Sequence, residues 1–405
     1  MKQKAVRRTA EEIRLPHGFS FATVAAGIKA SGRPDLSLVT VSEGAAAAAV
    51  FTRNRVVAAP VEVGRENLKS SKGRIRAILV NAGNANCATG PAGKVACKLV
   101  CKETARALGL RAEQVFPSST GIIGVPLPTE KIIAKLPELE GALTSAEDSA
   151  RAFANGILTT DTRAKVASAE IKIAGKKITL LGVAKGSGMI HPKMATMLAY
   201  VFTDITASPA DLQRLLRSVS NDTFNCISVD GDTSTNDTVL LVASGKSGVK
   251  LSAAGARFTA ALQRVCASLA EQIVSDGEGA KHVIHLNIEQ ARNREEALQI
   301  ARAIAHSPLV KTAWAGSDPN WGRILAAIGN SGVPIDPPKV RIYIGDQEVC
   351  RNGAFHAFDE SRAHEHLSQP DCEIRVRLNR GKAGLQFLTT DLTAEYVHIN
   401  ADYST

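Results

Sequence analysis

The stretch Lys185-Gly-Ser-Gly-Met-Ile-His-Pro-Lys-Met-Ala-Thr-Met-Leu-Ala-Tyr200 tells most about how this chain folds. It begins with a turn of small residues and continues into an apolar segment, Met194 to Tyr200, which indicates a buried strand. One hydroxyl, Thr196, stands among Met and Ala in that segment. β-Branched threonine is a good strand former. A strand position and a chemical role therefore both remain open for Thr196 at this point.

The overall composition is that of a globular protein. The 405 residues are 44% hydrophobic and 22% charged, which is enough for two or three core-forming units. The net charge of +10 suits a phosphate-binding face, but Lys and Arg are spread thinly and do not alternate with aromatic residues as single-strand-binding proteins require. We therefore expect no nucleic-acid partner. Small anionic substrates suit the charge equally well.

The cysteines and the chain start predict the compartment. Seven cysteines without a C-x-x-C pair indicate reduced, mostly buried thiols. The basic start is not followed by the apolar segment of a secretory signal. No window approaches the ~20 apolar residues of a membrane span. We expect a cytoplasmic protein without a membrane partner.

The pattern of apolar residues predicts a mixed α/β protein. Helices are expected at residues 91–108, 129–136, 145–158, 208–219, 253–274 and 292–305. Strands are expected at 75–80, in a hairpin within 166–181, and at 197–205, 239–243, 283–288 and 339–345, with a final β-rich run at 373–403. These elements do not alternate regularly as β-α-β units. The order therefore favours a mixed α/β sandwich over a doubly wound sheet.

The sequence gives little support for a metal site or a nucleotide-binding motif. The Asp-rich segment Ser228–Thr238 resembles a Ca²⁺ loop, but an EF-hand requires Gly and Glu at its sixth and twelfth positions. Counted from Asp230, those positions hold Thr235 and Leu241. A turn held by side-chain-to-backbone hydrogen bonds and a wall of a catalytic site remain as interpretations. Because the sequence also lacks H-E-x-x-H and a Cys partner at ligand spacing, we expect no metal. Walker and G-x-S-x-G patterns are absent too, so nucleotide binding and a nucleophile elbow have little support.

A hydroxyl nucleophile remains as the candidate chemistry. A threonine hydroxyl needs a base within hydrogen-bond reach, and the α-amine of an N-terminal threonine, with a pKa of about 7.7–8.0, can serve as that base. Such a residue requires a cut between Ala195 and Thr196. In self-cleavage the Thr196 Oγ would attack the Ala195 carbonyl, and water would open the resulting ester.

Seven motifs then match one family in order. They are Asn81-Ala-Gly-Asn-Ala-Asn86, Ser119-Thr-Gly-Ile-Ile-Gly124, Thr159-Thr-Asp-Thr162, Lys185-Gly-Ser-Gly-Met-Ile190, Met194-Ala-Thr-Met-Leu198, Asp276-Gly-Glu-Gly-Ala280 and the tail Ile399-Asn-Ala-Asp-Tyr-Ser-Thr405. This set closely resembles the ornithine acetyltransferases of the cyclic arginine pathway, some of which are also glutamate N-acetyltransferases. The similarity extends from about Gly18 to Thr405.

The resemblance implies both a fold and a reaction. The fold would be the α/β sandwich shared with N-terminal-nucleophile aminopeptidases, self-cleaved into an α chain (1–195) and a β chain (196–405) that assemble as α2β2. By a ping-pong mechanism, Thr196 would take the acetyl group from N²-acetylornithine, release ornithine and pass the acetyl group to glutamate. No cofactor is implied. The motifs do not decide whether acetyl-CoA is an additional donor, nor whether arginine or ornithine inhibits the enzyme.

The resemblance also implies the roles of individual residues. Thr196 would be the nucleophile, and Thr120 and Gly121 would form the oxyanion hole. The residues expected to bind substrate are Thr162, Lys185, Thr196, Glu278, Asn400 and Thr405. Lys185 suits a carboxylate, and Glu278 suits an amine. Asn400 and Thr405 imply that the C-terminal tail folds over the pocket, whereas the sequence alone predicts a frayed end.

The alternative enzyme is an N-terminal-nucleophile aminopeptidase of related fold, which would transfer the acyl group to water. The tail and the Lys185–Leu198 motif count against it. An assay of acetylornithine with and without glutamate separates the two, because a peptidase does not need glutamate.

Overall fold

The structure is a computed structural model that describes residues 13–190 and 197–402. Two mixed sheets stack face to face in its larger part. The first has the order β1 (Phe19–Val24), β2 (Leu36–Val41), β4 (Ala77–Asn84), β5 (Val115–Ile122). The second has the order β3 (Ala46–Phe51), β9 (Thr238–Ala243), β8 (Leu198–Thr203), β7 (Lys176–Lys185), β6 (Lys165–Ile173). Both sheets combine parallel and antiparallel pairs.

Strand β8 shows why the two sheets stack. Successive side chains of a strand point to opposite faces, so Tyr200 and Phe202 join the core between the sheets while Ala199 and Val201 join the core on the other face. The Phe202 ring meets Phe21 of the first sheet edge-on, with ring centroids 5.4 Å apart. Strand β8, which contains the described end of the predicted apolar segment, is therefore buried on both faces.

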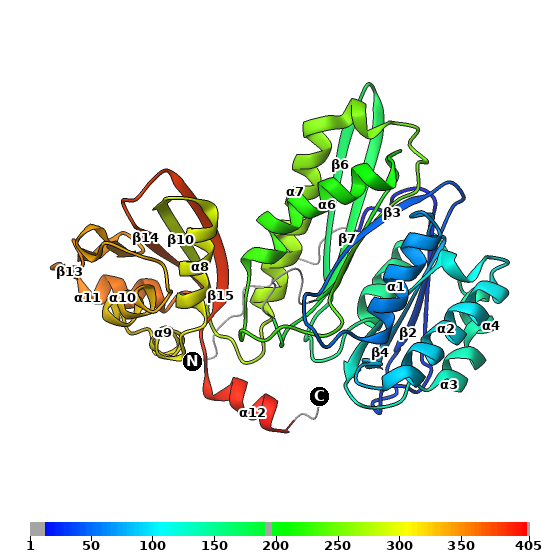
Figure 1. Cartoon of the computed structure of the whole chain (residues 1–405), viewed down its shortest axis with the longest axis horizontal. Helices are drawn as coiled ribbons and strands as arrows, with labels where there is room; N and C mark the ends of the chain where they lie inside the picture. The colour runs from blue at the N-terminus through cyan, green and yellow to red at the C-terminus, as the bar shows by residue number, and fades with distance from the viewer. Residues whose placement is uncertain (1–12, 191–196, 403–405) are drawn as a thin grey trace.

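Helices cover the outer faces of both sheets and complete the predicted α/β sandwich (Figure 1). The helices α6 (Pro209–Asp222) and α7 (Leu251–Ser275) pack on the five-stranded sheet. The four-stranded sheet is covered by α1 (Ala59–Ser70), α2 (Gly90–Ala107), α3 (Thr129–Ala134) and α4 (Leu136–Gly141), and α5 (Glu147–Gly156) packs on β1. Ser208 caps α6, which was predicted at 208–219, by accepting a hydrogen bond from the Asp211 N–H.

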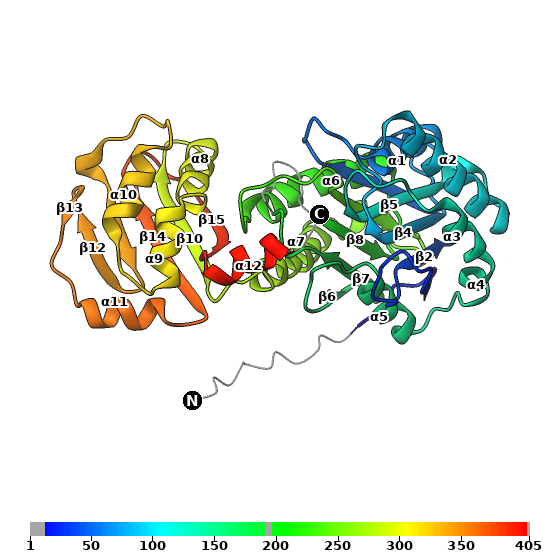
Figure 2. The same ribbon diagram turned by 90° about the horizontal axis from the view of Figure 1, so that it is seen from below.

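A second sheet-and-helix unit follows in the chain and lies beside α7 (Figures 1 and 2). Its six strands have the order β13 (Ala354–Phe355), β12 (Gln347–Arg351), β11 (Arg341–Ile344), β14 (Asp371–Arg377), β10 (Val283–Ala291), β15 (Ala383–Thr390). Its own apolar core includes residues of α8 (Arg294–Ala305), α9 (Pro308–Ala315), α10 (Trp321–Gly329) and α11 (Glu360–Leu367).

The end of the chain differs from the prediction. Residues 373–403 were expected to be β-rich, but β15 is followed by the helix α12 (Ala394–Asp402). The Thr393 hydroxyl accepts a hydrogen bond from the Tyr396 N–H, as an N-cap does. Figure 2 shows α12 between α7 and the six-stranded unit. The sequence expectation of a frayed end is therefore wrong for residues 394–402.

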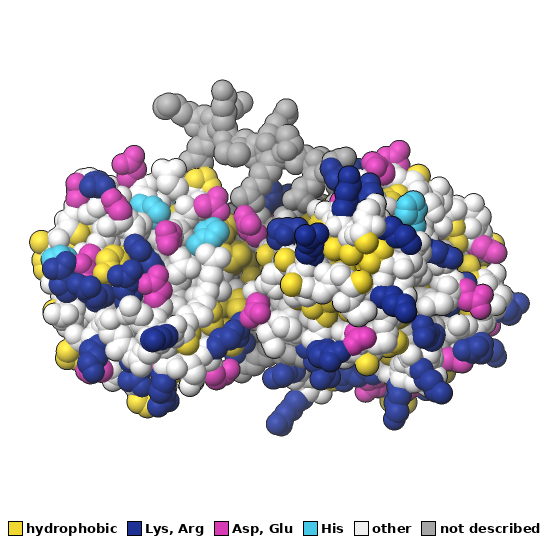
Figure 3. All heavy atoms as spheres, turned by 90° about the horizontal axis from the view of Figure 1, so that it is seen from above, with side chains coloured by type: hydrophobic (Ala, Val, Ile, Leu, Met, Phe, Trp, Pro, Cys, Tyr) yellow, Lys and Arg dark blue, Asp and Glu magenta, His cyan; other side chains and the backbone are white. Residues whose placement is uncertain are grey.

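The structure shows where the cysteines, the apolar helices and the charged side chains lie. All seven cysteines are free and buried, Cys97 and Cys101 among them on α2. Within residues 13–190 and 197–402, no helix has the length and apolarity to cross a membrane. On the face shown in Figure 3, Lys and Arg side chains are spread over both halves of the molecule, with Asp and Glu between them.

Candidate active site

A cavity of about 270 Å³ opens between the strands β5, β7 and β8, the segment before β9, the loop after α7 and the helix α12. Its walls combine hydroxyl, amide and charged side chains with small residues. They include Ala85, Thr120, Gly121, Thr159, Thr160, Lys185, Gly186, Gly188, Met189, Met197, Leu198, Asp230, Asp232, Ser234, Asn236, Asp237, Glu278, Tyr396 and Asn400. Five residues that the sequence motifs single out are thus brought together here: Thr120, Gly121, Lys185, Glu278 and Asn400.

The end of β5 presents Thr120 and Gly121 to the cavity. Strand β5 pairs in parallel with β4, and the register is interrupted by a bulge at Gly83 and Asn84. Gly121 has φ +132°, and a Cβ there would lie 2.3 Å from the carbonyl carbon of Gly83. Only glycine allows this backbone approach. The bulge and the glycine therefore fix the direction of the backbone at the pocket wall.

Lys185 ends β7 and reaches across to two hydroxyls. Its Nζ donates to Thr159 Oγ1 at 2.8 Å and to Thr120 Oγ1 at 3.2 Å. Because the ammonium occupies a lone pair of the Thr120 oxygen, the hydroxyl proton of Thr120 is left to point elsewhere. Thr120 is thereby prepared as a donor toward the cavity.

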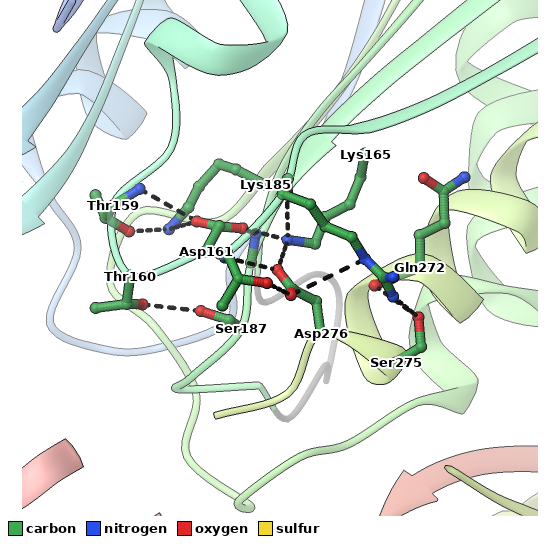
Figure 4. A network of polar contacts seen from close by, with 12 residues as sticks. Thr159, Thr160, Asp161, Lys165, Lys185, Ser187, Gln272, Ser275 and Asp276 are labelled. Atoms are coloured by element: carbon green, nitrogen blue, oxygen red, sulfur yellow. Dashed lines mark hydrogen bonds and ion pairs between the residues drawn. The ribbon is translucent and has the colours of Figure 1, made fainter. Parts of the chain in front are cut away.

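Behind Lys185 lies a buried network of two carboxylates and a second lysine (Figure 4). Lys165 Nζ, with a fully buried side chain, lies 2.6 Å from Asp161 Oδ1 and 2.5 Å from Asp276 Oδ2. Asp161 also accepts from the Gly186 N–H at 2.6 Å and lies 3.9 Å from Lys185 Nζ. Burial opposes the charge of Asp161, but Lys185 and Lys165 outweigh it and lower its pKa to about 2. The network therefore holds an ionised carboxylate directly beneath Lys185.

Thr162 belongs to this network and is not among the residues that line the cavity. Its Oγ1 donates to Asp276 Oδ1, and its N–H donates to Asp276 Oδ2 at 3.1 Å. Its neighbours Thr159 and Thr160 line the wall instead. The substrate-binding role expected of Thr162 thus stays a prediction, and the structure places the residue at the support of the pocket.

Glu278 and Asn400 meet at another part of the cavity wall. Asn400 Nδ2 of α12 donates to Glu278 Oε2 at 3.0 Å, and both side chains line the cavity. Gly188 provides the space for Glu278, because a Cβ at position 188 would lie 2.4 Å from Glu278 Oε2. The tail and the Lys185-Gly-Ser-Gly188 turn therefore converge on one carboxylate.

The Asp-rich segment 228–238 fulfils both interpretations left open by the sequence. Asp230 Oδ1 accepts from the Asp232 N–H and Ser234 Oγ accepts from the Asn236 N–H, both at 3.1 Å, so side chains hold the turn. Asn236 Nδ2 donates to the Ala85 and Ser119 carbonyls at 2.7 and 2.8 Å. The same segment also forms a wall of the cavity.

Three predicted residues, Ala195, Thr196 and Thr405, lie outside the described residues. Met197, which follows Thr196 in the chain, lines the cavity. Sequence reasoning missed Lys165, Asp161 and Asp237 as residues of the site or its support. The motif Thr159-Thr-Asp-Thr contains Asp161, but no local pattern predicts that Lys165, four residues later, is buried against it.

The donor set of the site is one of hydroxyls, amides and isolated charges. Over the described residues, His, Cys, Asp and Glu side chains do not form any group of three or more that is arranged to hold a metal ion. Backbone N–H and hydroxyl donors, such as those at the end of β5, are groups that acyl transfer uses to stabilise a negative oxygen.

Fold and pocket together define an α/β enzyme whose site has the donors for acyl transfer. A model described as the ArgJ family matches residues 20–405. The chain therefore belongs to the ArgJ family, and the resemblance drawn from the seven motifs is confirmed.

Full-length relatives support the assignment. The chain is 46% identical over 406 residues to the arginine biosynthesis bifunctional protein ArgJ of Methylococcus capsulatus, covering 98% of each chain. It is 47% identical to the protein of the same name from Thermus thermophilus, covering 97% of this chain and 100% of that one. A crystal structure of the Bacillus halodurans protein of that name is 41% identical, with a TM-score of 0.49, and covers 50% of this chain and 98% of its own.

Proposed function

We propose that the chain transfers the acetyl group of N²-acetylornithine to glutamate, giving ornithine and N-acetylglutamate in arginine biosynthesis. Membership of the ArgJ family, whose curated relatives are named as bifunctional proteins of arginine biosynthesis, supports this reaction. The observation that carries it in this chain is the convergence of Thr120, Gly121, Lys185, Glu278 and Asn400 on one cavity that Met197 also lines.

Thr196 is the proposed nucleophile. It is bonded to Met197, which lies on the cavity wall, so the proposed nucleophile is the chain neighbour of a pocket residue. Cleavage between Ala195 and Thr196 would free the α-amine that activates this hydroxyl. The acetyl group would then pass to Thr196 Oγ, ornithine would leave, and glutamate would take the acetyl group in a second step.

Thr120 and Gly121 would stabilise the negative oxygen that develops in both steps. One such donor is worth about 3–4 kcal/mol of transition-state stabilisation. The hydrogen bond from Lys185 Nζ to Thr120 Oγ1 supports this role, since it leaves the Thr120 proton available. Lys185 and Glu278 both line the cavity, and they would bind a substrate carboxylate and a substrate amine respectively.

The remaining parts of the proposal follow the family resemblance. Thr162 and Thr405 would complete the substrate site. The two chains of the cut protein would assemble as α2β2 in the cytoplasm. No cofactor is needed for this reaction, and acetyl-CoA is a candidate second donor for glutamate acetylation.

Denaturing electrophoresis together with an acetyl-transfer assay tests the proposal. Active wild-type protein should give two bands in place of one at 42.7 kDa. Thr196→Ala should leave the chain whole and abolish transfer. A single full-length band in active protein, or activity that survives Thr196→Ala, would place the nucleophile elsewhere.

The acceptor is tested separately. Acetylornithine should lose its acetyl group rapidly with glutamate and slowly without it, whereas an aminopeptidase of related fold would release acetate or amine equally well in both. Adding acetyl-CoA in place of acetylornithine then measures the second donor directly.

A further inference from the structure

The cavity is acidic although the protein as a whole is basic. The full sequence has a net charge of +10. Among the described residues that line the cavity, however, Lys185 is the single lysine or arginine, whereas Asp230, Asp232, Asp237 and Glu278 carry carboxyl groups. A cavity with this lining favours a ligand that brings positive charge to it.

The four carboxyl groups differ in how accessible they are to a ligand. Both oxygens of Asp230 accept backbone N–H groups, at 2.6, 2.9 and 3.1 Å. Asp237 is 2% exposed, and Glu278 already accepts from Asn400. Asp232 is exposed, and within the described residues its side chain forms no hydrogen bond or ion pair. Asp232 is therefore the carboxylate of the cavity that is most open to a ligand.

Asp232 and Glu278 lie at the same part of the cavity, beside Tyr396 of α12. Burial and the charges of Asp230, Glu278 and Asp232 raise the pKa of the Tyr396 hydroxyl. Such charge effects weaken with distance, so all three carboxyl groups lie near this phenol. The bond from the Asp232 N–H to Asp230 Oδ1 fixes the backbone there. Asp232 and Glu278 thus provide two acceptors for a cation near Tyr396.

The proposed reaction makes the charge at this place important. The acetyl group leaves the α-nitrogen of acetylornithine and reaches the α-nitrogen of glutamate, so the two amino acids occupy the cavity in turn with their α-carbons at the same place. Their side chains then extend in the same direction and end in opposite charges, an ammonium for ornithine and a carboxylate for glutamate. A fixed charge near the side-chain end favours one substrate over the other.

We propose that Asp232 is a specificity-determining residue that favours acetyl donors with a cationic side chain. This inference rests on the proposed function and assigns the recognition of its donor. The Asp232 carboxylate attracts the side-chain ammonium of acetylornithine, with Glu278 as its neighbour. Because Asp232 is exposed, water and salt weaken its charge. It therefore repels the side-chain carboxylate of glutamate without excluding glutamate from the cavity.

Asp232→Asn tests this role, because the amide keeps the size of the side chain and removes its charge. We would measure kcat/KM for acetylornithine and for glutamate in the acetyl-transfer assay. The value for acetylornithine should fall about fivefold and the value for glutamate should rise about twofold. The ratio of the two values should thus shift about tenfold toward glutamate. This ratio does not depend on the fraction of active protein, so slower maturation of the variant does not affect it.

Two further variants give the scale and the control. Asp232→Lys changes the charge by two units where Asp232→Asn changes it by one, so the ratio should shift by about the square, about 100-fold. Asp148→Asn removes an exposed carboxylate on α5 that is not among the residues lining the cavity, and the ratio should keep its wild-type value.

A wild-type ratio in Asp232→Asn, which includes an equal loss with both substrates, would overturn the role of Asp232 and leave the proposed function intact. A shift toward acetylornithine, a smaller shift in Asp232→Lys than in Asp232→Asn, or a complete loss of activity in Asp232→Asn would overturn it as well. Failure of the wild type to transfer acetyl from acetylornithine to glutamate would instead overturn the proposed function.

Discussion

Lys165 is fully buried between Asp161 and Asp276, and these two ion pairs hold together the elements behind the cavity wall. Removing one partner of a buried ion pair leaves the others charged without compensation. Lys165→Met should therefore lower the free energy of unfolding by about 3–5 kcal/mol, measured by urea denaturation. The matched control is Lys177→Met, which breaks a surface pair with Glu170 and should cost about 0–1 kcal/mol. Similar losses in both variants would contradict the role given to the buried pair.

Asp161 makes this stabilisation depend on pH. Its pKa in the folded protein is about 2, below the usual value of about 3.9 for an unfolded chain. A lowered pKa gives stability that is present above the unfolded value and is lost as the pH falls toward the folded one. The wild type should therefore be more stable than Asp161→Asn at pH 7, and the difference should shrink as the pH falls from about 5 toward 2. Urea titrations at several pH values measure it, and a constant difference would refute the assignment.

Lys185 contacts Thr120 in addition to the role that the sequence predicts for it, which is to bind a substrate carboxylate. If it only held a carboxylate, its loss would raise KM. Because its Nζ also bonds to Thr120 Oγ1, Lys185→Met should lower kcat as well, by about tenfold or more. Steady-state kinetics with acetylornithine separates the two effects. A changed KM with an unchanged kcat would show that Thr120 does not depend on this lysine.

At the scale of elements, α12 is a separable part of the site. None of its described residues is buried, yet Asn400 bonds to Glu278 at the cavity. Ending the chain at Thr393 should therefore change the free energy of unfolding by about 1 kcal/mol or less. It should raise KM about tenfold or more, because the cavity loses the wall formed by Tyr396 and Asn400, and Glu278 loses the partner that orients it. Val397→Ala, at an apolar residue that is 61% exposed on the same helix, should change neither. A large loss of stability on truncation would make α12 structural.

Helices and strands that have a clear pattern in their own short stretch of sequence were predicted correctly. The 166–181 hairpin was found because two β-rich runs flank Ala174-Gly-Lys176, and it forms β6 and β7 as predicted. Helix α12 was missed because its β-forming residues, such as Tyr396 and Val397, outweighed the capping signal of Thr393. The helices α1, α9, α10 and α11 were not predicted either.

Site residues that belong to motifs could be predicted from the sequence. Residues whose role depends on burial in the folded protein could not. Five motif residues meet at the cavity. Thr162, in contrast, turns to Asp276, because that carboxylate arrives from the end of α7, more than 100 positions later in the chain. Such tertiary effects leave no mark in local sequence.

At the scale of the whole molecule, the proposed cut would divide the polypeptide without dividing the fold. Strands β8 and β9 come after position 196, yet they lie side by side in one sheet between β3 and β7, which come before it. The two ladders that join these strands across the cut have six residue pairs each. The apolar cores on both faces of this sheet also combine residues from 1–195 and 196–405.

Cut wild-type protein should therefore behave as one particle in native buffer and as two chains only in denaturant. Size-exclusion chromatography should elute both chains together and at the same volume as the uncut Thr196→Ala variant, since the same strands and cores hold either form. Denaturing electrophoresis of that peak should give two bands for the wild type and one for the variant. Separation of the chains at neutral pH without denaturant would show that the continuous peptide, and not the shared sheet, holds the two parts together.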